Sequence, residues 1–286
     1  MENPWLERRV LAFAHQGGAK EAPSSTLFAI EAALAAGADV IELDVHASRD
    51  GVLLVGHDDT LDATTNGSGG IEAHLAAEVL GLDAAYWFVP GRGAQHGAAQ
   101  GEYTDRGRAV ADERFRPTTL ERVLEAFPGV LLNLDIKRTA PAVTPYEATL
   151  ARLLREHGRL DDVIVTSFFD QATEAFRALA PEVATSAGTN ALTAFVQAVR
   201  GGSQPDPSIR RHAALQLPLS YGGVRLIDER LIDAAHRNGL AVHVWTVDEE
   251  EDMELLVEQG ADGIMSDVPS VLCTALRRLG ATYRPR

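Results

Sequence analysis

The chain has 286 residues, of which 45% are apolar, and this is enough to bury the core of one large domain. Its formal net charge of -15 argues against a surface for nucleic acid or anionic membranes, because both require clustered lysines and arginines. The only cysteine, Cys273, excludes an intramolecular disulfide, and no apolar run approaches the ~18 residues of a membrane span. Since no signal-peptide pattern precedes the first apolar run, we expect a cytoplasmic protein without stable membrane insertion.

Apolar runs of strand length alternate with helical patterns along most of the chain. The predicted strands are 10–15, 40–46, 130–136, 163–167, 183–187, 213–217, 241–246 and 263–265. The predicted helices are 25–36, 118–126, 146–157, 170–179, 191–200, 228–238, 248–259 and 269–279. Buried strands that alternate with helices favour a parallel α/β fold, and a closed (β/α)₈ TIM barrel fits their number. A doubly wound open sheet is the alternative, although no dinucleotide-type G-x-G-x-x-G motif follows the first strand.

Two features depart from a plain barrel. Asp50 and Gly51 precede the apolar run 52–55, and an Asp-Gly pair between apolar runs predicts a hairpin after the second strand. With these two residues at the centre of the turn, antiparallel pairing places His57 opposite Asp44, on the same face. The segment 58–117 is then a long insertion within one domain that spans 1–286, and we expect it to cover the active-site mouth.

The second predicted strand carries two carboxylates, Glu42 and Asp44, in an otherwise apolar run. The two-residue period of a strand puts both on one face, which points inward in a barrel. Two buried carboxylates are costly unless a positive charge compensates them, so we expect a bound divalent cation, with a structural ion-pair network as the alternative. Asp135 repeats the pattern in the third strand and would add a third ligand. Oxygen ligands without thiols favour Mg²⁺ or Ca²⁺, and Mn²⁺ is compatible.

Four further side chains are candidates for chemistry or binding. His15 ends the first strand, and together with His57 it would supply an acid and a base near neutral pH. Lys137 shares a face with Asp135 and would hold an anionic group or pair with a carboxylate. Trp245 would line the substrate pocket, with packing inside the barrel as the alternative. Asp267 would cap the last helix or, as a second interpretation, orient a neighbouring side chain.

Motifs spread over nearly the whole chain resemble the glycerophosphodiester phosphodiesterase family. They include His15-Gln16-Gly17-Gly18, Glu42-Leu43-Asp44, Gly56-His57-Asp58, Leu134-Asp135-Ile136-Lys137, Val244-Trp245-Thr246-Val247 and Gly260-Ala261-Asp262-Gly263. The resemblance implies a (β/α)₈ barrel with a small insertion after the second strand and its hairpin. It also implies acid/base roles for His15 and His57, and a phosphate contact for Lys137. The divalent metal would be held by Glu42, Asp44 and Asp135.

The reaction that the resemblance implies is metal-dependent hydrolysis of a small-molecule glycerophosphodiester to an alcohol and glycerol 3-phosphate, in lipid and glycerol metabolism. Three positions depart from the family pattern. Gln16 stands where members often have arginine, so one cationic substrate contact is replaced by an amide. Asp135 is one methylene shorter than the usual glutamate, and the motif P-E-N-T is replaced by Pro23-Ser24-Ser25-Thr26.

Two other functions stay open at this point. Lys137 would serve as the Schiff-base lysine of an aldolase, or as part of a sugar-phosphate isomerase. Gln16 and Asp135 would also be compatible with a catalytically inactive, ligand-binding barrel. The sequence defines neither the alcohol attached to the phosphate nor the oligomeric state.

Overall fold

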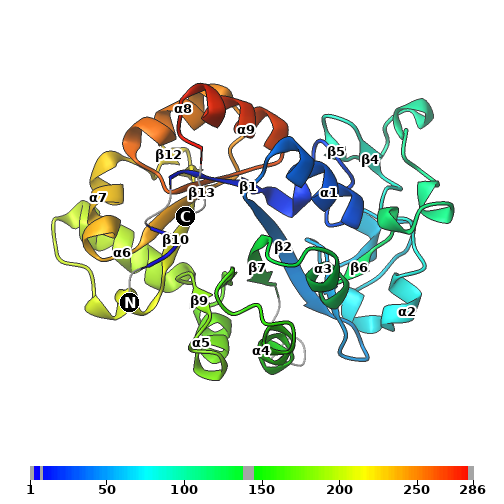
Figure 1. Ribbon diagram of the computed structural model, residues 1–286, viewed down its shortest axis with the longest axis horizontal. Helices are drawn as coiled ribbons and strands as arrows, with labels where there is room; N and C mark the ends of the chain where they lie inside the picture. The colour runs from blue at the N-terminus through cyan, green and yellow to red at the C-terminus, as the bar shows by residue number, and fades with distance from the viewer. Residues whose placement is uncertain (1–2, 7–8, 138–144, 283–286) are drawn as a thin grey trace.

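A nearly closed parallel barrel forms the centre of the computed structural model, which describes residues 3–6, 9–137 and 145–282 (Figure 1). The strands follow the order β10-β13-β14-β1-β2-β7-β8-β9. They are β1 (Leu11–Ala14), β2 (Val40–Ala47), β7 (Leu131–Ile136), β8 (Val163–Thr166), β9 (Ala184–Thr185), β10 (Ala214–Pro218), β13 (Ala241–Trp245) and β14 (Gly263–Ser266). A parallel bridge between Ser186 and Ala214 joins the two edges of the sheet. The predicted barrel is therefore confirmed, and the open sheet is wrong.

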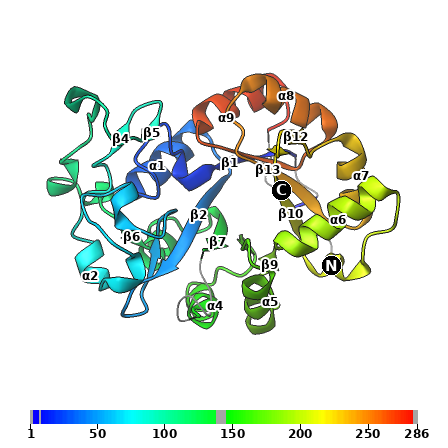
Figure 2. The ribbon, with the colours of Figure 1, turned by 180° about the vertical axis from the view of Figure 1, so that it is seen from behind.

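Helices surround the barrel on its outside (Figures 1 and 2). They are α1 (Leu27–Ala36), α3 (Leu120–Ala126), α4 (Glu147–Glu156), α5 (Asp170–Leu179), α6 (Thr189–Gly201), α7 (Glu229–Arg237), α8 (Glu250–Gln259) and α9 (Pro269–Arg278). Each of them overlaps a helix predicted from the sequence. Side chains stabilise several of their first turns: the Asp228 carboxylate, for example, accepts a hydrogen bond of 2.8 Å from the backbone N–H of Leu231 in α7. None of the helices in the described ranges is long and apolar enough to cross a membrane.

The alternation of side chains in β2 determines which residues reach the site. Ile41, Leu43 and Val45 are fully buried in the core between the sheet and its helices. Because successive residues of a strand point to opposite faces, Glu42 and Asp44 point into the barrel. A mainly apolar buried cluster that includes Phe13 of β1 and Val40 of β2 fills another part of the barrel, and the ring of His243 packs against Phe13 with centroids 4.7 Å apart.

The hairpin after β2 forms, but its predicted register is wrong by one residue. In the antiparallel pair of β2 with β3 (Leu53–Val55), Val45 lies opposite Val55, and the backbone N–H of Gly56 donates to the carbonyl of Asp44. The reason is Ser48, which pairs with Val52 through its backbone N–H and its hydroxyl, and so closes a three-residue loop. Because β3 ends at Val55, the direction of the His57 side chain is set by the following loop.

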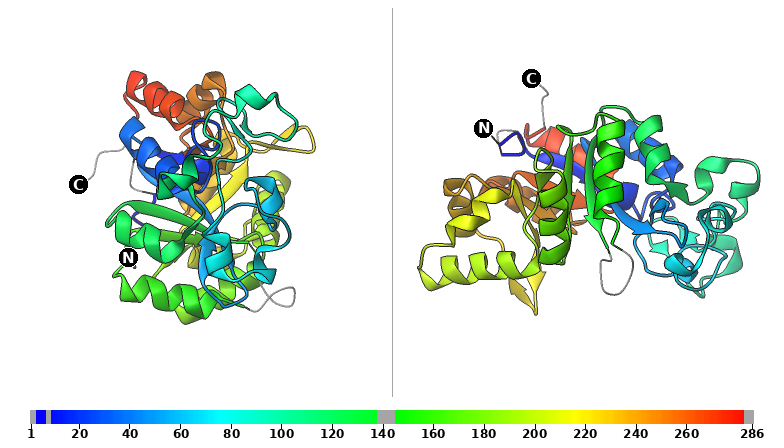
Figure 3. Two further views of the ribbon diagram at one scale, coloured as in Figure 1. Left: turned by 90° about the vertical axis from the view of Figure 1, so that its right-hand side faces the viewer. Right: turned by 90° about the horizontal axis from the view of Figure 1, so that it is seen from below.

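The insertion 58–117 lies beside the barrel, next to α1 and the β2–β3 hairpin (Figure 3). Its ring stack of Phe115 on Phe28 of α1, with centroids 4.4 Å apart, attaches it to the barrel. Within the insertion, the Arg106 guanidinium lies 4.2 Å from the ring of Tyr86 and 5.0 Å from that of Trp87. These aromatic side chains therefore pack inside the insertion, and the covering of the active-site mouth stays a prediction.

The remaining described elements are short. They are the helix α2 (Ala76–Val79), the strands β4 (Phe88–Val89), β5 (Gly93–Ala94), β6 (Thr118–Thr119), β11 (Ser220–Tyr221) and β12 (Val224–Arg225), and the 3₁₀ turns His15–Gly17, Leu61–Ala63, Ile71–Ala73, Gln100–Glu102, Arg108–Val110, Glu113–Phe115 and Pro207–Arg211. β6 pairs with β3, which ties the end of the insertion to the hairpin. β11 and β12 form a small hairpin in the loop after β10.

Candidate active site

Three predicted ligands meet at the carboxyl ends of the neighbouring parallel strands β2 and β7. In the register of these strands Asp44 lies directly beside Asp135. Glu42 lies two residues before Asp44 on the same face of β2. Glu42 and Asp135 are each 5% exposed, and Asp44 is 1% exposed. The strand alternation seen in the sequence therefore brings all three carboxylates together inside the barrel.

Lys137 is the positive charge closest to this cluster. Its Nζ lies 2.8 Å from Asp44 Oδ1 and 3.1 Å from Asp135 Oδ2. The other oxygens of the two carboxylates, Asp44 Oδ2 and Asp135 Oδ1, are buried without a hydrogen-bond partner. The pairing of Lys137 with carboxylates is thus confirmed, and one lysine leaves half of the buried acceptor capacity unused.

Lys137 offsets only part of the cost of burying the ionised carboxylates. Burial, reinforced by the charge of Asp44, raises the pKa of Glu42 to about 8. Burial also raises the pKa of Asp135 to about 6, although Lys137 opposes this shift. A second cation would stabilise the ionised form of these buried carboxylates and so lower their pKa values.

The donor set fits a hard divalent cation chemically, since it offers three carboxylates and two unpartnered buried oxygens. The side chains are not arranged as a formed site, however. Within the described ranges, no three histidine, cysteine, aspartate or glutamate side chains are grouped so that they could hold a metal ion. Instead, the Lys137 ammonium lies between Asp44 and Asp135.

His15 follows β1 in a tight turn that points its ring at the carboxylates. Its Nδ1 donates a 2.6 Å hydrogen bond to Asp267 Oδ1, and its Nε2 lies 3.9 Å from Glu42 Oε2. Burial opposes the charged ring, but the hydrogen bond to Asp267 and the charge of Glu42 outweigh this effect and raise the pKa of His15 to about 9. The helix-capping role for Asp267 is wrong, because α9 begins after Val268 and the backbone N–H of Ser270 in its first turn donates to the Glu21 carboxylate instead. Asp267 orients His15.

His57 reaches the same place from the loop after β3. Its ring centroid is 6.4 Å from that of His15, at an interplanar angle of 73°. Its Nδ1 lies 3.4 Å from Asp58 Oδ1, and this contact raises the pKa of His57. His46, which is 3% exposed, directs its Nε2 towards the carbonyl of His57 at 3.4 Å. His15 and His57 therefore each have a carboxylate at Nδ1 and leave Nε2 for other partners.

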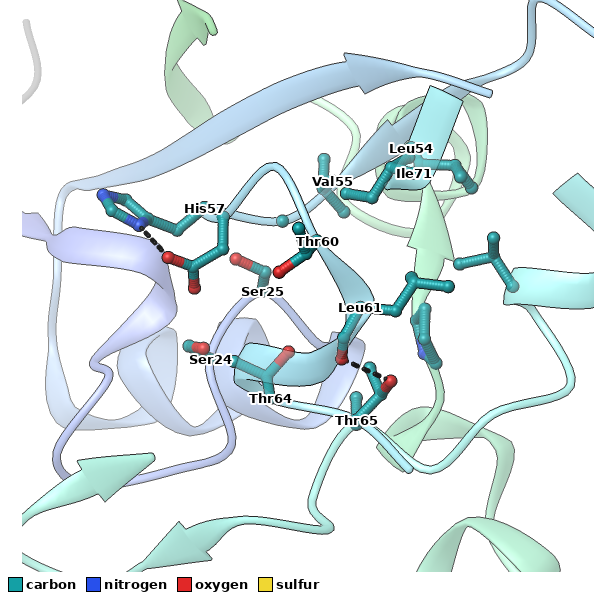
Figure 4. Close-up of a pocket in the computed structure, with 15 residues that line it drawn as sticks. Ser24, Ser25, Leu54, Val55, His57, Thr60, Leu61, Thr64, Thr65 and Ile71 are labelled. Atoms are coloured by element: carbon teal, nitrogen blue, oxygen red, sulfur yellow. Dashed lines mark hydrogen bonds and ion pairs between the residues drawn. The ribbon is translucent and has the colours of Figure 1, made fainter. Parts of the chain in front are cut away.

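A small cavity of about 40 Å³ lies beside His57, between the insertion and the loop after β1 (Figure 4). On the His57 side, the hydroxyls of Ser24, Ser25, Thr60 and Thr64 line it, while Leu54, Leu61 and Ile71 line the other end. These serines occupy the segment that departs from the family motif. The insertion thus contributes side chains next to one of the two histidines.

Gln16 is buried next to His15. Its backbone adopts a left-handed conformation with φ of 53°, and its N–H donates to Glu42 Oε2 at 3.0 Å. The side-chain Nε2 lies 3.4 Å from the Nε2 of His15. The amide of Gln16 therefore lies beside the His15 ring but brings no charge, and its contact with substrate stays a prediction.

Trp245 lies at the carboxyl end of β13 and contacts Phe168. The two rings meet edge to face, with centroids 5.6 Å apart, and the Phe168 ring is 5.6 Å from the Lys137 Nζ. Phe168 is 53% exposed, and the sequence assigned it no role. The signal that would have identified it is its position just after β8, where barrel residues line the mouth. The two rings form an apolar wall beside Lys137.

Comparison with known proteins identifies the family. The family model for the glycerophosphoryl diester phosphodiesterase family matches residues 15–271. A glycerophosphodiester phosphodiesterase of Caldanaerobacter subterraneus subsp. tengcongensis is 31% identical over 274 residues, which cover 95% of this chain and 100% of the relative. A glycerophosphodiester phosphodiesterase of Bacillus subtilis is 29% identical and covers 92% of this chain and 85% of its own length.

Solved structures agree with this result. The chain resembles an Oleispira antarctica phosphodiesterase in complex with the product sn-glycerol-3-phosphate, with a TM-score of 0.71 and 25% identity over 94% of this chain and 97% of the other. The chain therefore belongs to the glycerophosphoryl diester phosphodiesterase family, a family of hydrolases that the sequence motifs had already indicated.

Proposed function

We propose that the protein hydrolyses glycerophosphodiesters to an alcohol and glycerol 3-phosphate, with a divalent cation and with His15 and His57 as acid and base. The observation that carries the proposal is the placement of the two imidazole rings, 6.4 Å apart, beside three buried carboxylates. The family membership supports the substrate class, and so does the relative that holds glycerol 3-phosphate.

Glu42, Asp44 and Asp135 are the residues that would hold the cation, which we propose to be Mg²⁺ or Ca²⁺, with Mn²⁺ as a further option. The support is the unpartnered buried oxygens of Asp44 and Asp135 and the raised pKa of Glu42. A bound divalent cation would supply charge neutralisation at a non-bridging oxygen of the phosphodiester.

The two histidines would move protons at opposite sides of the phosphorus. One imidazole removes the proton of the attacking hydroxyl, and the other donates a proton to the oxygen of the departing alcohol. In the family-like version, the 2-hydroxyl of the glycerol attacks first, and water then opens the cyclic phosphate. Since Asp267 and Asp58 lie at the Nδ1 atoms, the Nε2 atoms of both rings are the ones that would exchange these protons.

Three further residues would bind the substrate. Lys137 would attract the phosphate. Its side chain lies at the carboxylate cluster and is 15% exposed, so a ligand can reach it. The side-chain amide of Gln16 would donate a hydrogen bond to the substrate at the position where other family members often have arginine. Trp245, together with Phe168, would contact the apolar side of the glycerol.

Turnover of glycerophosphocholine tests the proposal, in the presence of Mg²⁺, Ca²⁺ or Mn²⁺ and after chelation. We expect at least about a hundredfold loss of kcat in His15→Gln and in His57→Gln, because proton transfer by a positioned side chain contributes that much. His157→Gln is the matched control, since His157 follows α4 at the opposite end of the barrel. Full activity of either active-site variant, or of the chelated enzyme, would contradict the proposal.

The alternative functions are less compatible with this geometry. A Schiff base needs a neutral lysine, yet Asp44 and Asp135 outweigh the effect of burial and raise the pKa of Lys137. A catalytically inactive barrel would bind metal and glycerophosphodiester without turnover, so the same assay detects it. A cytoplasmic location and a role in lipid and glycerol metabolism stay predictions from the sequence.

A further inference from the structure

Behind His15, a polar network joins three loops at the carboxyl end of the barrel. Lys20, in the loop after β1, places its Nζ 2.6 Å from Asp248 Oδ2. Asp248, in the loop after β13, accepts hydrogen bonds at Oδ1 from the backbone N–H of Asp267 at 2.9 Å and from the Ser266 hydroxyl at 3.0 Å. Both oxygens of the Asp248 carboxylate therefore accept hydrogen bonds or ion-pair contacts, and one of them binds the backbone of Asp267, the partner of His15.

Asp267 is fixed from several sides. Its Oδ1 accepts from His15 Nδ1 at 2.6 Å, and its Oδ2 lies 4.0 Å from the Nζ of Lys20. The carbonyl of Asp267 also accepts from the backbone N–H of Lys20 at 3.1 Å. One lysine thus contacts the main chain of Asp267 and the carboxylates of both Asp267 and Asp248.

The network is compact because the chain packs tightly there. Gly18 has a φ of +95°, and a Cβ at this position would meet the Pro269 side chain at 2.8 Å. The loop after β1 and the start of α9 are therefore in direct contact. Without the Lys20 ammonium, the Asp248 carboxylate would lose its ion pair, and its repulsion of the nearby Asp267 carboxylate would no longer be offset by the charge that lies between them.

We propose that Lys20 and Asp248 are positioning residues for His15. They hold the Asp267 carboxylate in one place, so that the His15 ring keeps its Nδ1 bonded to Asp267 and presents Nε2 on the Glu42 side. The kinetic consequence rests on the proposed acid/base role of His15, whereas the orientation of the ring rests only on the contacts among Lys20, Asp248, Asp267 and His15.

The kinetic test compares Lys20→Met and Asp248→Asn with the wild type on glycerophosphocholine. We expect kcat to fall about tenfold with KM unchanged, because a misplaced proton-transfer group slows chemistry more than binding. Lys20→Arg keeps the charge and should retain most of the activity. In the double variant Lys20→Met/Asp248→Asn, the two losses should not multiply, since both changes break one network.

The control is an ion pair of similar length that does not reach His15. Arg225 of β12 lies 2.8 Å from Asp252 of α8, and Arg225→Met should leave kcat unchanged. A rise of KM alone in Lys20→Met would overturn the proposal, because it would make Lys20 a substrate contact. Wild-type kcat in both Lys20→Met and Asp248→Asn would overturn it as well.

A spectroscopic test separates this proposal from the proposed function. The Nδ1 proton of His15 gives an imidazole resonance that His15→Gln assigns by removing it. We expect this resonance to shift or broaden in Lys20→Met and Asp248→Asn and to stay unchanged in Arg225→Met, whether or not glycerophosphocholine is hydrolysed. An unchanged resonance in both network variants would overturn the positioning role, while the loss of turnover in the wild type would contradict only the proposed function.

Discussion

Replacing Lys137 by methionine should strongly destabilise the protein in the absence of divalent cations. The Lys137 ammonium contacts two carboxylates, Asp44 and Asp135, whose side chains are 2% and 7% exposed. Removing one partner of a buried ion pair leaves an uncompensated charge and costs about 3–5 kcal/mol. We therefore expect the free energy of unfolding to fall by about that amount at neutral pH.

Urea unfolding, with chelator present, measures this loss. Arg152→Met is the control: its partner Glu156 is 2.6 Å away, both side chains are more than half exposed, and an exposed pair of this kind contributes less than about 1 kcal/mol. Lys137→Met/Asp44→Asn should recover part of the stability, because one of the two buried charges is then absent.

Added Mg²⁺ or Ca²⁺ gives the same experiment a second readout. A cation at 100 times its dissociation constant stabilises the folded state by about 2.7 kcal/mol. If the carboxylates Glu42, Asp44 and Asp135 hold the cation, Lys137→Met should regain stability with the ion, whereas Arg152→Met should gain no more than the wild type. Unfolding of Lys137→Met at the wild-type urea concentration would contradict the predicted loss of stability, and a transition that neither divalent ion shifts would contradict the predicted cation site.

Three further predictions follow from the buried histidines, Asp267 and Phe168. Burial lowers the pKa of His243 to about 3 and that of His212 to about 4, so both are neutral when folded but take up protons near pH 6.5 when unfolded. The contribution of these two histidines to stability should therefore fall as the pH is lowered below about 6.5, by up to about 1.4 kcal/mol per pH unit for each. Glu42 and Asp135, with their raised pKa values, act in the opposite direction, so the test is the difference between His243→Gln and the wild type: the variant should lose less stability, or gain more, in urea midpoints between pH 7 and 5. Asp267→Asn removes the charged partner of His15 and should lower kcat by about a hundredfold or more; a kcat near that of the wild type speaks against the orienting role. Phe168→Ala removes part of the apolar wall and should raise the KM for glycerophosphocholine about fivefold, and an unchanged KM means that the substrate does not reach this ring.

The sequence was sufficient for the barrel and for the carboxylate cluster. Both rest on short periods: alternation within β2 and β7 decides which side chains point inward, and parallel neighbours bring Asp44 beside Asp135. Such strand patterns can be recognised in a sequence without knowing the conformation of any loop. Predicted bounds differ from the observed ones mainly at the ends, as for β9, which shortens from 183–187 to Ala184–Thr185.

Features set by loops were not predictable from these patterns. The register of the β2–β3 hairpin depends on the hydroxyl of Ser48, which competes with the Asp-Gly turn for the closing hydrogen bonds. His57 reached the site even though the assumed register was wrong, because β3 ends at Val55. The role of Asp267 depends on a contact with His15 across 252 positions of sequence, and nothing local distinguishes it from a helix cap.

That separation along the chain has a consequence for biosynthesis. The carboxylates of β2 and β7 and the two histidines are all made within the first half of the chain, but β1 pairs with β14, and Asp267 follows β14 directly. Ribosomal synthesis proceeds from the N-terminus at about 5–20 residues per second, so more than a hundred residues follow Lys137 before Asp267 emerges. During that interval the nascent chain carries the acidic cluster without an oriented His15. A polypeptide that stalls before β14 would therefore have the acidic residues of the site but no Asp267 to orient His15. Synthesis of the last strand and of Asp267 is thus the step that completes the site.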